Sequence, residues 1–196
     1  MVTTLMSGLL ALDTWTFHVI NRSFQNPLFD LVMPILSTKR YFLLPAAVVI
    51  LMLVVWGGRR MWVVLAVAVA AVALSDMGTN LIKAALHRTR PCHVLHDVHL
   101  LAGCTGSFSL PSNHASNMFA LAAVGCLGLP HWRWVLIVLA AGVAYSRVYL
   151  GVHYPGDVLA GAVWGGAVGW ACSALSVRLC PGNRTSPPSG CTEFTP

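Results

Sequence analysis

The chain has 196 residues, of which 57% are hydrophobic and only 9% carry charge. Soluble domains carry about 25% charged residues, so this composition excludes an ordinary soluble protein and indicates a chain embedded in a membrane. The net charge is +6, but the 12 basic residues form no run that could follow a phosphate backbone, so nucleic acid is not an expected partner.

The N-terminal stretch has the least regular pattern. Residues 5–20 mix Asp13 with Leu, Trp and Phe, which is typical of an amphipathic helix at the membrane surface or against the bundle. An Asn-Pro pair at 26–27 interrupts it, and residues 28–36 are too short to cross a bilayer alone. We treat residues 5–36 as one unit, with one full span and a re-entrant piece as the alternative. Its start has no cationic region, so no cleaved signal peptide is expected.

Longer apolar segments follow, separated by turn signals. Residues 41–56 are almost purely apolar, and a turn at 57–60 leads to a helix at 61–86 whose second half is amphipathic. Asp76 and Asn80, one turn apart in that half, are expected to form an internal polar pair. After a loop at 87–110, we expect helices at residues 113–127, 132–149 and 155–179.

These segments predict one all-α domain over residues 1–180, with its core at 41–179. At about 20 residues per span, the domain is an integral membrane bundle of roughly five or six transmembrane helices. Residues 181–196 are rich in Pro, Ser, Thr and Gly and predict a disordered tail. The sequence does not indicate an oligomeric state.

Three polar clusters lie at the ends of the predicted helices. The first helix of the series ends near Lys83 and Arg90, and the next begins at Ser112, a plausible N-cap. The third ends at Arg147, and the last begins near Asp157. Because successive spans alternate direction, all of these groups reach the same membrane face. The sequence therefore predicts a single active site at one face of the membrane.

The three cations of this predicted site suit a phosphate. Arg90 and Arg147 offer planar forks that match phosphate oxygens, and Lys83 adds a third positive charge. Lys83 and Arg90 are seven residues apart, so they are expected on one side of a helix that Pro91 stops. Ser112 and the backbone N–H groups that open its helix add neutral donors. Together they describe a binding site for a tetrahedral oxyanion.

Two histidines supply the reactive groups. His153 and Asp157 are four residues apart, so the carboxylate can accept a proton from one ring nitrogen and leave the other with a lone pair. His153 is thus a candidate nucleophile and Asp157 the group that orients it. His114 lies close to Ser112 and can protonate a departing oxygen.

The three clusters resemble the signature motifs of the type 2 phosphatidic acid phosphatase superfamily. The resemblance covers residues 83–157 and implies attack by a histidine on phosphorus, a phosphohistidine, and hydrolysis by water without a metal or another cofactor. It implies His153 as nucleophile, Asp157 as its partner and His114 as general acid. The implied phosphate ligands are Lys83, Arg90, Ser112 and Arg147. The matching stretches are Lys83 with Arg90-Pro91, Pro111-Ser112-Asn113-His114, and Ser146-Arg147 with His153 and Asp157.

One position departs from the family pattern. The second motif usually reads Pro-Ser-Gly-His, and Asn113 replaces the glycine. If the position requires a positive φ, Asn is the least costly substitute, and its backbone amide still faces the phosphate. The Asn113 side chain could instead touch the substrate, so we include it among the phosphate-binding candidates.

Other polar residues near the motifs have simpler interpretations. Arg88 is expected to be a surface or lipid-headgroup contact. His93, His96 and His99 recur at every third residue, but the segment is loop-like and we favour no metal site. Cys92 and Cys104 lie in the same loop and would pair in an oxidising compartment.

The charges outside the site indicate its orientation. Outside the proposed ligands, the membrane face away from the site carries more basic residues than the face that holds the site. Basic residues are enriched on the cytoplasmic side, so this favours a bacterial inner membrane with the site facing the periplasm or exterior. The far-face arginines are Arg59, Arg60, Arg133, Arg178 and Arg184, against Lys39, Arg40 and Arg88 on the site face.

The resemblance implies a lipid phosphatase whose substrate keeps its tail in the bilayer. An outward site suits recycling of a carrier lipid, so we favour a polyprenyl diphosphate such as undecaprenyl diphosphate, with lipid A phosphates or phosphatidylglycerol phosphate as alternatives. Transfer of the phosphoryl group to a second lipid is a further alternative. Non-catalytic lipid-phosphate binding or transport is less favoured because the reactive groups are present. Vanadate-dependent haloperoxidases share the motifs but are large and soluble.

Overall fold

The computed structural model describes residues 2–179, and the tail expected at 181–196 lies outside this range. Within it the chain forms helices and loops and no strand, which confirms the all-α class. The helices are α1 (Val2–His18), continued by the π-helix η1 (Val19–Ser23), α2 (Pro27–Ser37), α3 (Lys39–Trp56), α4 (Gly58–Leu86), α5 (Pro91–Val94), α6 (Asn113–Gly128), the 3₁₀ turn η2 (Pro130–Trp132), α7 (Arg133–Tyr149) and α8 (Pro155–Leu179).

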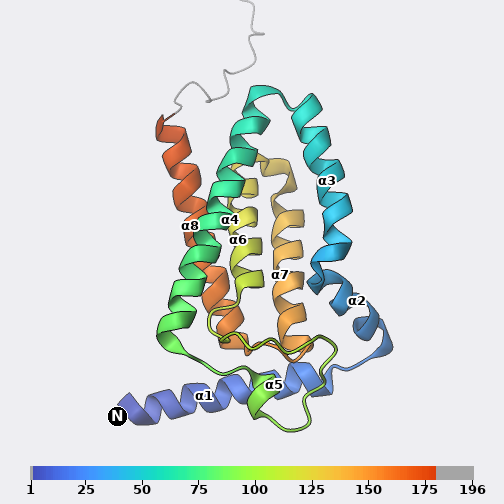
Figure 1. Cartoon of the computed structure of the whole chain (residues 1–196), viewed down its shortest axis with the longest axis vertical. Helices are drawn as coiled ribbons and strands as arrows, with labels where there is room; N and C mark the ends of the chain where they lie inside the picture. Colours follow the sequence, from blue (N-terminus) through green and yellow to red (C-terminus); the bar gives the residue numbers. More distant parts are fainter. Residues whose placement is uncertain (1, 180–196) are drawn as a thin grey trace, which may run out of the picture.

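The long helices run along one axis, and α1 lies across one end of them (Figure 1). The loop that carries α5 covers the same end. Helix α6 is central and packs against α4, α7 and α8. Helix α1 therefore lies against the end of the bundle. The chain breaks at the Asn-Pro pair, where the Asn26 side chain caps α2 by accepting from the Phe29 N–H at 2.9 Å.

A small-residue face on α8 permits close packing against α6. Gly161, Gly165 and Gly169 recur at every fourth residue and meet the backbone of α6. A Cβ built on Gly165 would lie 1.8 Å from the Ser116 carbonyl oxygen, so any side chain there would force the two helices apart. Close approach through glycine is typical of helix pairs inside membranes.

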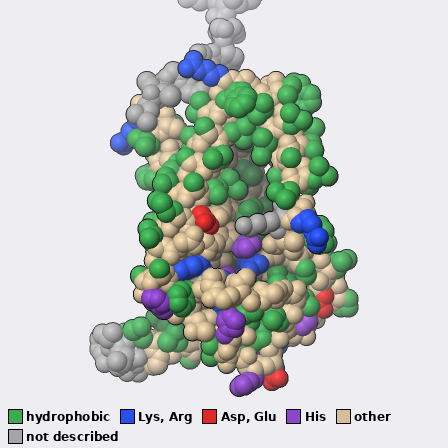
Figure 2. Space-filling model, in the orientation of Figure 1, with side chains coloured by type: hydrophobic (Ala, Val, Ile, Leu, Met, Phe, Trp, Pro, Cys, Tyr) green, Lys and Arg blue, Asp and Glu red, His purple; other side chains and the backbone are tan. Residues whose placement is uncertain are grey.

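Two segments of the described chain are long and apolar enough to cross a membrane. They are Gly58–Val94, which contains α4 and α5, and Pro155–Arg178, which lies in α8. Shorter apolar helices occur at Pro27–Ser37 and Leu43–Trp56. Hydrophobic side chains cover the upper sides of the bundle, whereas the acidic groups and histidines in this view lie from its middle downward, and basic groups lie both there and at the top (Figure 2). Two segments do not establish about five or six crossings, so that number stays a prediction.

The end of α4 differs from the prediction. The helix ends at Leu86, because His87 adopts a left-handed conformation with φ of 51° and its N–H bonds back to the Lys83 carbonyl at 3.1 Å. Arg90 therefore does not share a helix with Lys83, and Pro91 begins α5 instead of stopping α4. The expectation of one helix for both cations was wrong. At the other end, α4 already begins at Gly58, so the predicted turn at 57–60 is shorter.

Candidate active site

The loop between α7 and α8 fixes the position of His153. The Arg147 carbonyl accepts from the N–H groups of Val152 at 3.2 Å and His153 at 3.3 Å, which folds the loop back onto the end of α7. Gly151 permits this fold because its φ is +79° and a Cβ there would lie 2.5 Å from Val98. His153 is consequently held at the end of the bundle with only 2% of its surface exposed.

His153 faces Asp157, and Ser109 lies between them. The His153 Nδ1 atom is 3.6 Å from Asp157 Oδ2, slightly beyond hydrogen-bond distance. The Ser109 hydroxyl donates to Asp157 Oδ2 and lies 3.4 Å from His153 Nδ1. All three side chains are buried, with Asp157 and Ser109 fully so. Ser109 was missed at the sequence level, since it lies in the loop before the second motif and no local pattern marks it.

Arg90 fixes the other face of the imidazole. Its Nη1 atom lies 2.9 Å from His153 Nε2 and 2.9 Å from the Val152 carbonyl, and its Nε donates to the Ser107 carbonyl at 2.8 Å. A guanidinium has donors and no acceptor, so Nε2 must be the acceptor in this contact. The ring proton then belongs to Nδ1, which faces Asp157. In this arrangement the lone pair of Nε2 accepts from the Arg90 guanidinium.

The surroundings of His153 also keep the ring neutral. The pKa of His153 is lowered from its ordinary value of 6.5 to about 4, chiefly because burial penalises the charged form. The positive charges of Arg90 and Arg147 act in the same direction, and Asp157 acts against them. A neutral imidazole is the form that can act as a nucleophile.

Lys83 and Ser112 lie in the same network. Lys83 Nζ donates to the Phe108 carbonyl oxygen at 2.5 Å, and Arg90 Nη2 lies 3.4 Å from the same oxygen. The two cations therefore share one acceptor. The Ser112 N–H donates to the Asp157 carbonyl at 2.9 Å, whereas its hydroxyl is buried without a hydrogen bond. Ser112 occupies the predicted N-cap position of α6, but its side chain makes no capping bond. Its hydroxyl therefore remains available to a ligand.

Arg147 and His114 both lie near Ser37 of α2. Arg147 donates to the Ser37 hydroxyl of α2, and its Nε is buried without a partner. His114, in the first turn of α6, and Ser37 line one cavity of about 500 Å³. Ser37 thus connects Arg147 to the cavity that His114 lines.

Asn113 is placed differently from the other predicted ligands. Its amide donates to Asp76 at 2.9 Å and to Asn80 at 3.1 Å, both on α4. Asn80 in turn donates to Asp76 at 3.1 Å, so the expected polar pair on α4 is present. The backbone of Asn113 is helical, and among the described residues positive φ outside glycine occurs only at His87 and Asp97. Asn113 therefore does not have the positive φ that would favour glycine or asparagine at this position, so backbone conformation does not explain the substitution.

Arg88 is half-buried and contacts the site instead of lying on the open surface. Its side chain is 19% exposed. One guanidinium nitrogen lies 2.7 Å from Asp157 Oδ1, and another lies 2.5 Å from Asp13 Oδ2 of α1. Its guanidinium also lies 4.2 Å from the centre of the Tyr154 ring. Asp13 accepts in addition from the Gly156 N–H at 2.7 Å. The expectation of a surface contact was wrong, because both carboxylates are far from Arg88 in the sequence and only folding brings them together.

The loop over the site is held by a disulfide between Cys92 and Cys104, which confirms the predicted pairing. His93 Nε2 lies 3.3 Å from Cys104 Sγ, and these two residues with Cys92 have the spacing of metal ligands. Cysteines joined in a disulfide offer no thiolate to a metal. His99 instead contacts Asp30 of α2 at 2.9 Å, so His93 and His99 have separate partners.

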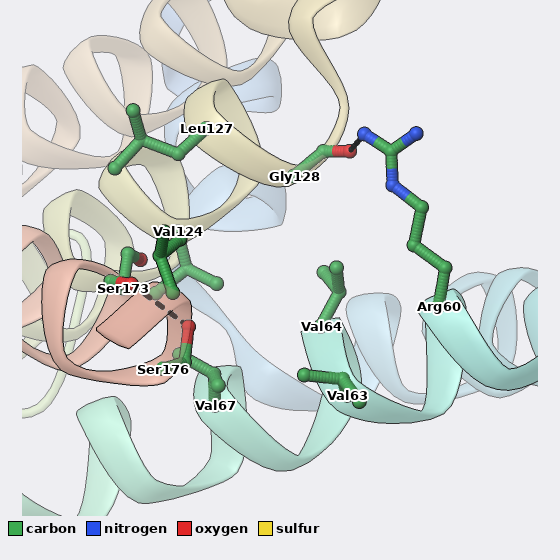
Figure 3. Close-up of a pocket in the computed structure, with 10 residues that line it drawn as sticks. Arg60, Val63, Val64, Val67, Val124, Leu127, Gly128, Ser173 and Ser176 are labelled. Atoms are coloured by element: carbon green, nitrogen blue, oxygen red, sulfur yellow. Dashed lines mark hydrogen bonds between the residues drawn. The ribbon is translucent and has the colours of Figure 1, made fainter. Parts of the chain in front are cut away.

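A smaller cavity of about 140 Å³ lies between α4, α6 and α8 (Figure 3). Its walls are mostly apolar, and Arg60 closes one side by donating to the Gly128 carbonyl at 3.1 Å. None of the predicted site residues lines it. The chemistry is therefore gathered at the opposite end of α4.

Comparisons with known proteins agree with the motifs. The profile of the PAP2 superfamily matches residues 61–179, which include all three clusters. Lipid A 4'-phosphatase of Bacteroides thetaiotaomicron is 36% identical over 59% of this chain and 55% of its own length. Undecaprenyl-diphosphatase of Sulfolobus acidocaldarius is 34% identical over 62% of this chain and 56% of its own length. The chain thus matches about half the length of these relatives.

Solved structures share the fold. Aquifex aeolicus LpxE superimposes with a TM-score of 0.65 at 25% identity, over 85% of this chain and 95% of that chain. A transmembrane PAP2-type phosphatidylglycerolphosphate phosphatase from Bacillus subtilis gives a TM-score of 0.64 at 23% identity, over 90% of this chain and 88% of that chain.

Proposed function

The chain belongs to the PAP2 superfamily, and from that membership we propose that it is a membrane lipid phosphatase that acts through a phosphohistidine on His153. The observation that carries the proposal is the contact of 2.9 Å between His153 Nε2 and Arg90 Nη1, with Nδ1 turned toward Asp157. It supports a neutral imidazole with its proton on Nδ1. The Nε2 lone pair accepts from Arg90, and attack requires a bound phosphoryl group to replace the Arg90 N–H at that atom.

The proposed reaction has two steps. Nε2 of His153 attacks phosphorus, the bond from phosphorus to the lipid-side oxygen breaks, and His114 gives that oxygen a proton. Asp157 stabilises the positive charge that develops on the ring. Water then attacks the phosphohistidine, with His114 taking its proton, and releases inorganic phosphate. Lys83, Arg90 and Arg147 balance the negative charge of the transferring group, and the Ser112 hydroxyl adds a donor. The route uses the residues of this chain and needs no metal or other cofactor.

Membrane insertion and orientation form the second part of the proposal. We place the chain in a bacterial inner membrane, with about five or six crossings and the site facing the periplasm or exterior. The disulfide over the site supports an oxidising compartment on that side. Arginines at the far ends of α4, α7 and α8 support a cytoplasmic location for the opposite face; they are Arg59, Arg60, Arg133 and Arg178.

The substrate is a lipid phosphate or diphosphate. We favour a polyprenyl diphosphate because an outward-facing site suits recycling of a carrier lipid, and one relative is named an undecaprenyl-diphosphatase. Lipid A phosphate is the second candidate, because another relative is named a lipid A 4'-phosphatase. Phosphatidylglycerol phosphate and transfer to a second lipid are the remaining alternatives, and product analysis with a labelled donor distinguishes transfer from hydrolysis.

Phosphate release in detergent with EDTA tests the activity. The panel contains polyprenyl diphosphate, polyprenyl phosphate, lipid A, phosphatidylglycerol phosphate and phosphatidic acid. We expect release from at least one lipid, loss of at least about 1,000-fold in His153→Gln, and a base-stable, acid-labile phosphorylated protein in a rapid quench. His131→Gln, an exposed histidine of η2, is the matched control and should retain activity. Loss of all activity in EDTA, or full activity of His153→Gln, would contradict the proposal.

A further inference from the structure

Ser109 is a fully buried loop residue that lies within the site although it belongs to none of the three motifs. Its backbone is held on both sides. Its N–H donates to the Arg88 carbonyl at 2.7 Å, and its own carbonyl oxygen lies 3.4 Å from Lys83 Nζ. These bonds tie Ser109 to the end of α4 and to the segment that follows it. The hydroxyl is therefore held in place by the part of the chain that supplies two cations of the site.

The donors around Asp157 leave little room for the His153 ring. Asp157 Oδ1 accepts from Arg88 Nη1 at 2.7 Å. Asp157 Oδ2 accepts from the Tyr154 N–H at 2.9 Å and from the Ser109 hydroxyl. A carboxylate oxygen has two lone pairs, so these two donors fill Oδ2. His153 Nδ1 lies 3.6 Å from that oxygen, beyond hydrogen-bond distance, so the ring does not bond to it directly.

The Ser109 hydroxyl has a free acceptor site toward the ring. A serine hydroxyl carries one hydrogen and two acceptor lone pairs, whereas an ionised carboxylate has no hydrogen to donate. The hydrogen of Ser109 therefore belongs to its bond with Asp157 Oδ2. Toward His153 Nδ1, which is 3.4 Å away, Ser109 Oγ acts only as an acceptor. The ring proton must consequently lie on Nδ1.

The contact at the other ring nitrogen leads to the same proton position. Arg90 Nη1 donates to His153 Nε2 at 2.9 Å, which also leaves the ring proton to Nδ1. The two contacts involve different partners on opposite sides of the ring. The imidazole is thus held at both nitrogens, by Arg90 at Nε2 and by Ser109 at Nδ1.

We propose that Ser109 is a positioning residue for the nucleophile, which accepts the Nδ1–H of His153 and donates to Asp157, so that the carboxylate acts on the ring through the hydroxyl. The inference rests on the proposed function and adds to it a residue that the motifs do not contain. When Nε2 attacks phosphorus, positive charge develops on the ring and the proton stays on Nδ1. The bond from Nδ1–H to Ser109 then becomes charge-assisted and stronger.

Burial makes this hydroxyl difficult to replace. Ser109 is fully buried and His153 is 2% exposed, so bulk water does not reach Nδ1. Without the hydroxyl, the Nδ1–H has no acceptor within hydrogen-bond distance, and the positive ring loses its connection to Asp157. Loss of Ser109 should therefore affect turnover more than substrate binding.

Two variants at position 109 separate the hydroxyl from packing. Ser109→Ala removes the hydroxyl and Ser109→Thr keeps it, and both change a fully buried side chain. We expect kcat for phosphate release to fall roughly 10- to 100-fold in Ser109→Ala, with KM changed less than about threefold. Ser109→Thr should retain at least roughly a third of the wild-type kcat. Equal losses of kcat in the two variants at equal thermal midpoints would indicate packing alone and overturn the inference.

Ser173→Ala is the matched control for the loss of a buried serine hydroxyl. Ser173 lies in α8 beside the smaller cavity, and its hydroxyl donates to the Gly169 carbonyl at 2.9 Å. Its removal should leave kcat and KM unchanged, because this hydroxyl has no contact with the site.

A double-variant cycle tests whether Asp157 acts through Ser109. Asp157→Asn alone should lower kcat, because it removes the charge at the end of the connection. If the carboxylate acts through the hydroxyl, kcat of the Ser109→Ala, Asp157→Asn double variant should lie within about threefold of the lower single variant. Effects that multiply would indicate two independent contacts with the ring and would overturn the inference.

The hydrogen bond itself is measured without turnover. In protein labelled with ¹⁵N-histidine, the Nδ1-bound proton of His153 should exchange slowly with water. This protected signal should persist in Ser109→Thr and Ser173→Ala and be lost in Ser109→Ala. If the wild type releases no phosphate from any lipid but shows this pattern, the proposed function fails and the position of Ser109 stands. If phosphate is released and Ser109→Ala keeps either the protected signal or the wild-type kcat, the inference about Ser109 fails alone.

Discussion

Arg88 links the candidate catalytic carboxylate to the helix that lies across the end of the bundle. Its Nη1 lies 2.7 Å from Asp157 Oδ1, and its Nη2 lies 2.5 Å from Asp13 Oδ2 on α1. Asp157 is fully buried, so Arg88 compensates a charge that water cannot reach. The position of α1 on the bundle is thereby connected to the orientation of His153.

Removal of this link should lower both stability and turnover. We expect Arg88→Ala to destabilise the fold by about 3 kcal/mol, because it leaves a buried carboxylate without its cation. Asp13→Asn keeps an acceptor for the Gly156 N–H but weakens the pair with Arg88, so kcat should fall about tenfold with little change in KM. Thermal unfolding and phosphate-release kinetics measure the two effects.

The pair between Arg22 and Asp97 provides a matched control for Arg88. Its atoms are 3.0 Å apart, but the side chains are 44% and 80% exposed. Exposed pairs contribute less than about 1 kcal/mol, so Arg22→Ala should leave stability and kcat nearly unchanged. Equal effects of the two arginine substitutions would contradict the role given to Arg88.

The lowered pKa of His153 predicts how stability depends on pH. The folded ring stays neutral down to about pH 4, whereas the unfolded ring takes up a proton near its ordinary value of 6.5. Between these values the unfolded chain binds more protons, so stability falls as the pH falls, by up to about 3 kcal/mol once the pH is below 4. The thermal midpoint of the wild type should therefore decrease from pH 6.5 to pH 4.5 more steeply than that of His153→Gln.

Direct titration gives a second measurement of the same group. In protein labelled with ¹⁵N-histidine, the His153 ring signals should show the neutral Nδ1–H form at pH 6 and change only near pH 4. The signals are identified by their loss in His153→Gln. A ring that is half protonated at pH 6.5 would be incompatible with the buried, cation-lined environment.

The disulfide between Cys92 and Cys104 should stabilise the loop over the site. It closes a segment with a sequence separation of 12, for which loss of the cross-link reduces stability by about 3 kcal/mol. We expect the Cys92→Ser, Cys104→Ser double variant to unfold at a lower temperature, and reductant to affect the wild type but not the variant. Cys126→Ala, a free cysteine, is the control. Peptide mass mapping that finds both cysteines alkylatable in native protein would contradict the pairing.

The contact between α8 and α6 gives a test of packing alone. Gly165→Ala places a Cβ about where the Ser116 carbonyl oxygen lies, at 1.8 Å, so the helices must separate and stability should fall by about 2 kcal/mol or more. At Gly166 a Cβ meets nothing within 4 Å, and Gly166→Ala should be neutral or slightly stabilising. The difference in thermal midpoint between these neighbouring variants is the measurement, and equal midpoints would contradict the packing.

Much of this protein follows from short-range information. Apolar segment lengths and an Asn-Pro break predict most helix boundaries, because these depend on neighbours within a few turns. Alternating helix direction predicts one end of the bundle for Arg90 and His153, which are in contact although 63 residues separate them. The motifs also supply the residues of the proposed site, because phosphate binding and nucleophilic attack require particular side chains.

Tertiary structure decided the rest. His87 ends α4 before Arg90, Ser109 enters between His153 and Asp157, and Asn113 turns toward Asp76. Arg88 finds carboxylates 69 and 75 residues away in opposite directions along the chain. No local pattern specifies such partners, because a buried charge is satisfied by whichever group the packed helices bring within about 3 Å. Sequence alone therefore determined which residues carry the proposed chemistry and the end of the bundle that holds them. Only the folded chain determined which groups orient, compensate and surround His153, the proposed nucleophile.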